Sequence, residues 1–205
     1  MFETLFLLAA RCAKSIGVHQ WHNLRGQVSD EEIEEMRNVS YCLYTLDKVV
    51  CWTAGSSPTI SSSEVYIDSS LSSPDDPTMC HLMSKVKLCL IEETIYLEAY
   101  ASQARWKSKP KVLQLCSEIH HRLQGWLTDA GIDLHQAEHS LEYPAPKTEL
   151  AVDFLCTQML LIWPFQGQPD AEFAHGQNIA RRWMELTLRL WTSPPDQTHQ
   201  MPPPL

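Results

Sequence analysis

Apolar residues recur at steps of three and four along most of the chain, and this is the period of an α-helix. The pattern predicts about six helices, in an irregular array, with an all-α fold. The predicted helices cover residues 2–16, 29–53, 79–106, 110–131, 147–163 and 169–191. No segment alternates apolar and polar positions with the period of a strand.

Local signals mark the ends of the first two helices. Gly17 follows the first apolar series and can take the left-handed conformation that ends a helix. Ser29 precedes the second series, with Glu32 three residues later, which is the spacing of a capping box. Both signals therefore support the boundaries that the apolar period predicts.

Two segments lack the helical period. Residues 55–77 hold nine serines and three prolines, too little apolar surface to offset the entropy of ordering. We expect an extended loop that wraps the helical body and is pinned by a few apolar residues. These residues are Ile60, Val65, Tyr66, Ile67 and Leu71. The Pro-rich residues 193–205 are predicted to be a disordered tail, which leaves one helical domain over residues 1–192.

Charge and hydropathy narrow the class of protein. The 205 residues include 25 acids and 16 bases, for a net charge of −9. This balance argues against binding of a phosphate backbone by the chain itself, since such binding depends on basic residues. No segment approaches the ~20 apolar residues of a membrane span or matches a signal peptide. We therefore expect a globular intracellular protein without a membrane partner.

The candidate metal and thiol sites are weak. The seven cysteines include no C-x-x-C pair, which favours small buried apolar side chains in a reduced compartment. His135 and His139 have the helical spacing of two metal ligands, but the acid of the H-E-x-x-H motif is missing. Cys116 and His120 share the same spacing, and a core position is the better interpretation of Cys116. We expect no metal, no cofactor and no catalytic residue.

Two clusters of charged residues are also expected at the protein surface. Glu92, Glu93 and Glu98 are expected on a solvated helix face rather than in acid–base chemistry. The basic run 105–111 could contact phosphate or direct nuclear import, but a solvated loop is the favoured interpretation. No Gly-rich phosphate loop, Rossmann fingerprint or G-x-S-x-G motif is present. The sequence therefore does not predict an enzyme.

Four motifs in order resemble the fungal-specific transcription factor domain, the middle homology region of fungal zinc binuclear-cluster regulators. Residues 10–19, ARCAKSIGVH, resemble its A-R-x-A-x-x-[IL]-G-[LV]-H motif, and residues 35–48 resemble E-x-R-R-x-[FW]-W-x-x-Y-x-L-D-[RK]. Residues 55–60 stand where the family has G-R-P-x-x-I, and residues 158–165 resemble L-L-L-x-R-P-F. Ser56 and Trp163 replace the two motif arginines, so contacts made by those arginines are missing. The resemblance extends from Phe2 to about Trp191.

The matched residues are interpreted as architecture. Arg37, Tyr41, Tyr44 and Lys48 share one stripe of the second helix, with Asp47 at its edge, so we expect a local polar network there. The residues to which we assign this structural role are Arg11, Gly17, His19, Arg37, Tyr44, Asp47, Gly55, Pro58 and Pro164.

The resemblance implies a nuclear transcription-regulatory protein, with the cytoplasm as the alternative location. The family's zinc cluster and coiled coil are not in this sequence, which begins inside the domain. We therefore expect an N-terminally truncated regulator, or a fragment, that acts through protein contacts and does not bind DNA specifically. The alternatives are a helical module that senses a small metabolite, an enzyme with an unrecognised helical site, and a remnant that does not fold alone.

The expected truncation also predicts an interaction surface. Without preceding helices, the apolar residues of the first helix would be exposed on more than one face, and such patches mark contacts or aggregation. Leu5 and Phe6 are the candidate residues for self-association or partner binding through residues 2–10.

Overall fold

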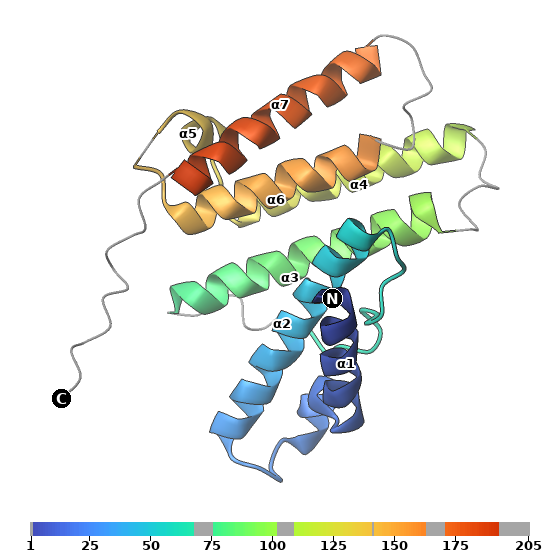
Figure 1. Ribbon diagram of the computed structural model, residues 1–205, viewed down its shortest axis with the longest axis vertical. Coiled ribbons are helices and arrows are strands. Elements are labelled where there is room, and N and C mark those ends of the chain that lie inside the picture. Colours follow the sequence, from blue (N-terminus) through green and yellow to red (C-terminus); the bar gives the residue numbers. More distant parts are fainter. Residues whose placement is uncertain (1, 68–75, 102–108, 141, 163–170, 193–205) are drawn as a thin grey trace. The chain divides into compact units, whose positions relative to one another are not determined.

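The chain folds into helices, as the apolar period predicts (Figure 1). The computed structural model describes residues 2–67, 76–101, 109–140, 142–162 and 171–192, and these residues contain no strand. The helices are α1 (Phe2–Ser15), η1 (Val18–Leu24), α2 (Asp30–Ala54), α3 (Pro77–Ile95), η2 (Tyr96–Tyr100), α4 (Lys109–Asp129), α5 (Leu134–His139), α6 (Ala145–Ile162) and α7 (Ala171–Thr192). The all-α prediction is confirmed.

Each of the six predicted helices is present, with most ends displaced by only a few residues. The third differs most, because α3 ends at Ile95 and continues as one π-helical turn, η2, after which the backbone becomes extended at Ala101. Two short elements were not predicted: the 3-10 helix η1 and the six-residue helix α5. Elements this short contain too few turns to show a period.

The predicted helix ends have the expected geometry. The Ser29 side chain accepts a hydrogen bond from the Glu32 amide while the Glu32 carboxylate accepts one from the Ser29 amide, which completes the capping box. Gly55 ends α2 with φ 64°, and Gly17 lies between α1 and η1 with φ 79°. At both positions a β-carbon would be strained, because this region of backbone conformation disfavours L side chains.

The chain divides into two compact units, Met1–Gly131 and Ile132–Leu205. In the first unit α2 packs against α1, η1 and α3, and α3 packs against α4. Its main apolar cluster consists of Phe6, Ala10, Trp21, Ile33, Tyr41, Tyr44, Val50, Ile60, Val65, Met79, Met83, Val86 and Cys89. The prediction of a single domain over residues 1–192 stays a prediction.

The second unit contains α5, α6 and α7. Helices α6 and α7 lie antiparallel and side by side (Figure 1), and both contact α5. The Arg189 guanidinium donates to the carbonyls of Ala137, Glu138 and Ser140 at the end of α5, and Arg182 pairs with Glu138. Two arginines of α7 therefore hold the short helix in place.

The serine-rich segment contains no helix or strand where the structure describes it, from Gly55 to Ile67, and turns at residues 62–64. We call residues 55–67 the extended segment. Ile60 and Val65 are buried in the apolar cluster of the first unit, while Tyr66 stacks on His22 with 4.6 Å between the ring centroids. The expectation of a loop pinned by these residues is confirmed. Leu71, the basic run up to Ser108, and the tail 193–205 lie outside the described residues.

The membrane prediction can be compared with the helices directly. Among the described residues, no helix combines the length and the apolar character that crossing a bilayer requires.

Candidate functional site

Three charged side chains meet in the interior of the first unit. The Lys48 ammonium lies 3.2 Å from Asp47 Oδ2 and 3.2 Å from Glu93 Oε2. All three residues are at least 95% buried. The Tyr44 hydroxyl donates to Glu93 Oε2 at 2.8 Å, and Lys48 Nζ lies 4.2 Å from the centre of the Tyr44 ring. We call Tyr44, Asp47, Lys48 and Glu93 the charge cluster.

Helix geometry brings these groups together. Tyr44, Asp47 and Lys48 are separated by three and four residues and therefore share one face of α2. Glu93 comes from the last turn of α3, which packs against α2. The sequence already contained a signal for Glu93, because it follows the buried Val86 by seven residues and so continues an apolar face.

The charge cluster holds the extended segment to both helices. Asp47 accepts hydrogen bonds from the backbone amides of Thr59 (3.0 and 3.1 Å) and Ile60 (3.1 Å), and Lys48 donates to the Ile60 carbonyl at 2.6 Å. Glu93 accepts from the Ser62 amide at 3.0 and 3.1 Å and from the hydroxyls of Ser61 and Ser62. Each buried carboxylate therefore has several donors.

A second ion pair fixes the same segment to α1. Lys14 Nζ lies 2.7 Å from Glu64 Oε2, and Glu64 also accepts from the Ser61 amide at 3.2 Å. The Lys14 hydrogen bond is the main cause that lowers the pKa of the Glu64 carboxyl. This pair is partly exposed, so its contribution to stability is expected to be small.

Burial and hydrogen bonds shift the pKa values of Glu93 and Tyr44 in opposite directions. Burial alone would raise the pKa of Glu93, but the Ser62 amide, the Tyr44 hydroxyl and the Lys48 ammonium together lower it. Burial and the neighbouring Glu93 charge raise the pKa of Tyr44. Glu93 is therefore ionised and Tyr44 neutral over the physiological range. Each of the four groups contacts its neighbours, so the arrangement ties α2, α3 and the extended segment together.

The prediction for Glu93 is therefore wrong. We expected Glu92 and Glu93 on a solvated face, but Glu93 is 5% exposed and Glu92 is only half-buried. The reason is that Lys48 of α2 supplies a buried countercharge 45 residues earlier in the chain. Arg37, expected in the same polar stripe, instead contacts Glu34 and Asn38 of its own helix.

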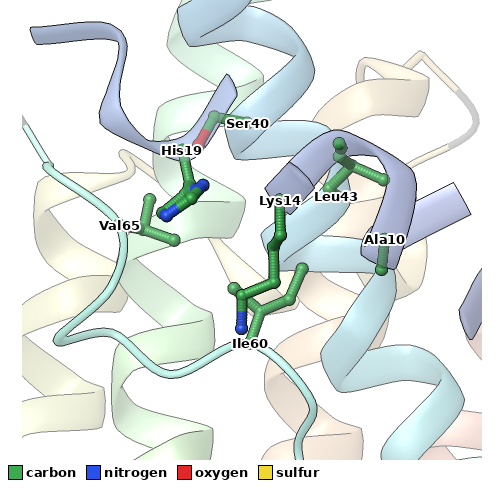
Figure 2. Close-up of a pocket in the computed structure, with 8 residues that line it drawn as sticks. Ala10, Lys14, His19, Ser40, Leu43, Ile60 and Val65 are labelled. Carbon is green, nitrogen blue, oxygen red and sulfur yellow. The ribbon is translucent and has the colours of Figure 1, made fainter. Parts of the chain in front are cut away.

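A small cavity lies in the first unit (Figure 2). Its volume is about 10 Å³, and its lining comes from α1, η1, α2 and the extended segment. The lining residues are Ala10, Lys14, His19, Ser40, Leu43, Ile60, Val65 and Ala13. His19 Nδ1 and Ser40 Oγ are buried and have no hydrogen-bond partner among the described residues. A space of this size takes about one water molecule.

A second pocket, of about 120 Å³, lies between η2 and α4. Glu98, Lys111, Gln114, Leu115 and Glu118 line it. Pockets that enclose metabolites usually measure about 300–1,000 Å³. Neither cavity approaches that size.

The thiol and histidine candidates do not form a site. His135 and His139 stack with 4.5 Å between their ring centroids, and His139 Nδ1 lies 3.0 Å from the His135 carbonyl. Cys116 is half-buried and His120 is exposed. No group of three or more histidines, cysteines or acids that could hold a metal occurs among the described residues.

The cysteines as a class are less buried than predicted. Only Cys51 and Cys89 are buried, whereas Cys12, Cys42 and Cys80 are exposed. Burial raises the pKa of the Cys51 thiol to about 11, which keeps it protonated and unreactive.

The other residues of the family motifs do not cluster at one position in the structure. Arg11 is exposed on α1, His19 lines the small cavity, and Pro58 is half-buried just before the residues that bind Asp47. Gly17 and Gly55 occupy the left-handed positions described above. Pro164 lies outside the described residues.

The predicted interaction surface on α1 needs a correction. Phe6 is 5% exposed and belongs to the apolar cluster, so it is part of the chain's own core. Leu5 is exposed, as is Leu8 on the same side of α1. Sequence periodicity alone did not show which of the neighbouring residues 5 and 6 faces the core. A contact through Leu5 stays a prediction.

Comparison with known proteins gives a consistent result. The family model described as the fungal specific transcription factor domain matches residues 1–128. Transcription factor sphG of Aspergillus fumigatus is 47% identical over 198 residues, which are 97% of this chain and 27% of that protein. An ABC-transporter-regulating transcription factor of Aspergillus oryzae is 26% identical over 152 residues, 68% of this chain and 17% of the relative. No solved structure matches.

Proposed function

We propose that this chain, which belongs to the family of the fungal-specific transcription factor domain, has a transcription-regulatory role and acts in the nucleus through contacts with other proteins. The observation that carries this proposal is a folded helical unit with a wholly internal charge cluster and exposed apolar helix faces. Exposed apolar faces of this kind are typical of surfaces that bind partners.

The chain spans about a quarter of the length of its 47% identical relative. The proposal therefore concerns what these 205 residues do, whether alone or as a segment of a longer regulator. With a net charge of −9, the chain itself is not expected to bind duplex DNA specifically, because phosphate contacts need basic excess.

A role as a metabolite sensor is less well supported. The two cavities described above measure about 10 and 120 Å³, and the smaller fits a single water. No described arrangement supports catalysis either, and the family consists of transcription regulators rather than enzymes. Protein contact is the function that the geometry supports best.

A tethering experiment tests the proposal. The full chain is fused to a heterologous DNA-binding domain, and transcript from a reporter with the matching sites is measured in a fungal host. We expect the fusion to change reporter transcription relative to the DNA-binding domain alone. The matched control is the Lys48→Met fusion, in which loss of the buried countercharge is expected to destabilise the fold, and this variant should weaken or lose the effect.

Three results would count against the proposal. A tethered chain with no effect on the reporter would contradict action through protein contacts. Specific retention of duplex DNA by the purified chain, at physiological salt and with competitor DNA present, would contradict the absence of DNA binding. A fluorescent fusion that stays outside the nucleus would contradict the proposed location.

A further inference from the structure

Helix α2 exposes an apolar face on the side opposite the charge cluster. Val39, Cys42, Leu46 and Val49 follow one another at steps of three, four and three residues, so they lie along one side of the helix. All four are exposed, and the exposed fraction rises from 41% at Val39 to 57% at Val49. We call these residues the outer stripe. Their spacing is that of the seam through which one helix packs along another.

The outer stripe has an acidic end. Glu35 and Glu31 continue the same line toward the start of α2, four and eight residues before Val39, and both are exposed. At the other end Thr53 follows Val49 by four residues and carries no charge. A partner that covers the whole line therefore needs an apolar stripe and positive charge at one end.

We propose that the outer stripe is a docking site for an amphipathic helix of a partner protein that carries lysine or arginine beside Glu31 and Glu35. The inference rests on the proposed function and specifies its partner. Burial of the four apolar side chains supplies the attraction. The charges select the direction in which the partner helix lies and exclude acidic partners.

A second copy of α2 fits the outer stripe less well. In a parallel pair, Glu31 and Glu35 of the two copies would lie side by side, and like charges repel. In an antiparallel pair centred near Tyr44, Val39 would face Val49, but Glu35 would face Thr53 and have no countercharge. Charge complementarity therefore favours a basic partner over self-pairing.

Peptide binding to the full chain tests the site. The probe is a labelled three-heptad peptide with leucines at steps of three and four and a cluster of lysines at one end. The matched probe has glutamates in place of the lysines. By fluorescence anisotropy we expect the basic peptide to bind about tenfold more tightly than the acidic one at low salt, with a smaller difference near 0.5 M salt.

Three variants locate the site. Leu46→Asp should weaken binding of the basic peptide at least about tenfold, because it places a charge in the apolar middle. Glu31→Lys with Glu35→Lys should abolish the preference for the basic peptide. Glu118→Lys with Asp129→Lys changes the net charge equally, at exposed positions of α4, and should leave the preference intact. Circular dichroism of each variant confirms that helix content is retained.

Several results would overturn the inference. Equal binding of the two peptides, unchanged binding by Leu46→Asp, or loss of the preference in the α4 control would each do so. A wild-type dimer in sedimentation that Leu46→Asp converts to monomer, and that excludes the basic peptide, would assign the stripe to a second copy. The assay contains no DNA or transcription, so peptide binding without a reporter effect counts against the proposed function and not against the docking site.

Discussion

Each of the two faces of helix α2 contains residues that depart from the usual distribution of side chains. The inner face carries Asp47 and Lys48, which are almost completely buried, and the outer face carries Leu46 and Val49, which are exposed. Charged residues are rarely buried unless they are paired, and each buried charge here has specific partners. The comparison indicates that the inner face fixes the architecture, while the outer face is available for contacts.

The difference also separates two kinds of constraint on the sequence. A buried ion pair contributes little net stability compared with an apolar replacement of the whole set, but loss of one partner is costly. The apolar residues of the outer face are about half exposed and therefore contribute less to stability than buried core residues. Substitutions on the two faces should therefore affect different measurements.

The largest expected effect comes from Lys48→Met. It leaves the carboxylates of Asp47 and Glu93 buried without their shared countercharge, at a cost of about 3–5 kcal/mol in the free energy of unfolding. Urea unfolding followed by circular dichroism measures it. Lys87→Met, at an exposed position of α3, is the matched control and should change little. A loss below about 1 kcal/mol for Lys48→Met would show that the cluster is not a structural requirement.

The next effect extends the comparison to α1, which also has one buried and one exposed face. Phe6→Ala should destabilise the chain by about 3 kcal/mol, because a large core side chain is removed. Leu5→Ala, one residue away and exposed, should change stability by less than about 0.5 kcal/mol. Thermal and urea unfolding of the two variants measure the contrast. Equal losses would show that Leu5 also belongs to a folded core.

Low pH should remove the stabilisation that comes from the contacts between Glu93 and the inner face of α2. The lowered pKa of Glu93 means that the unfolded chain takes up this proton first, near its ordinary value of 4.5. The stabilisation is therefore present above that pH and is lost as the pH falls through the folded-state pKa. Free energies of unfolding between about pH 3 and 7 should show the wild type and Glu93→Gln converging at the acid end. Parallel curves would contradict this assignment.

A smaller change in the free energy of unfolding is expected at Gly55, where α2 ends. Gly55→Ala should cost about 1–2 kcal/mol, since alanine is strained at φ 64° although no atom lies within 4 Å of its β-carbon. Gly125→Ala, inside α4 and equally open, should instead stabilise the chain by about 0.5–1 kcal/mol. Urea unfolding of both variants tests the opposite signs, and two effects of the same sign would contradict the backbone explanation.

The smallest effect is expected on the outer face. Leu46→Ser should leave the free energy of unfolding within about 0.5 kcal/mol of wild type, because the side chain is 43% exposed in the folded chain. Chemical denaturation measures the difference, with the buried Val50→Ser of the same helix as the comparison. A large loss for Leu46→Ser would mean that the outer stripe is already covered in the isolated chain.

Much of the fold was predictable from the sequence because long amphipathic helices repeat their pattern over several turns. The period located α2 to within a residue or two, and Ser29 with Glu32 marked its start. The family motifs drew attention to Tyr44, Asp47 and Lys48 in the same helix. Each of these signals is local, and each concerns residues a few positions apart.

The residues that contact this face of α2 were harder to predict, because their contacts depend on long-range packing. Glu93 meets Lys48 only when α3 lies against α2, and Ser62 reaches Glu93 across 31 residues. The short helices η1 and α5 contain too few turns for a period. The choice between Leu5 and Phe6 depends on where α1 contacts its neighbours, and an apolar pattern that includes both cannot decide it.

The way in which Asp47 holds the extended segment has a consequence for sequence variation. Its carboxylate is recognised by the main-chain amides of Thr59 and Ile60, which every amino acid except proline provides at those positions. Thr59 can therefore be replaced by other residues without loss of its hydrogen bond to Asp47, whereas replacement of Asp47 itself removes these hydrogen bonds. An insertion or deletion between Gly55 and Thr59 would shift both amides out of register, so this segment should tolerate exchange of residues much better than a change of length.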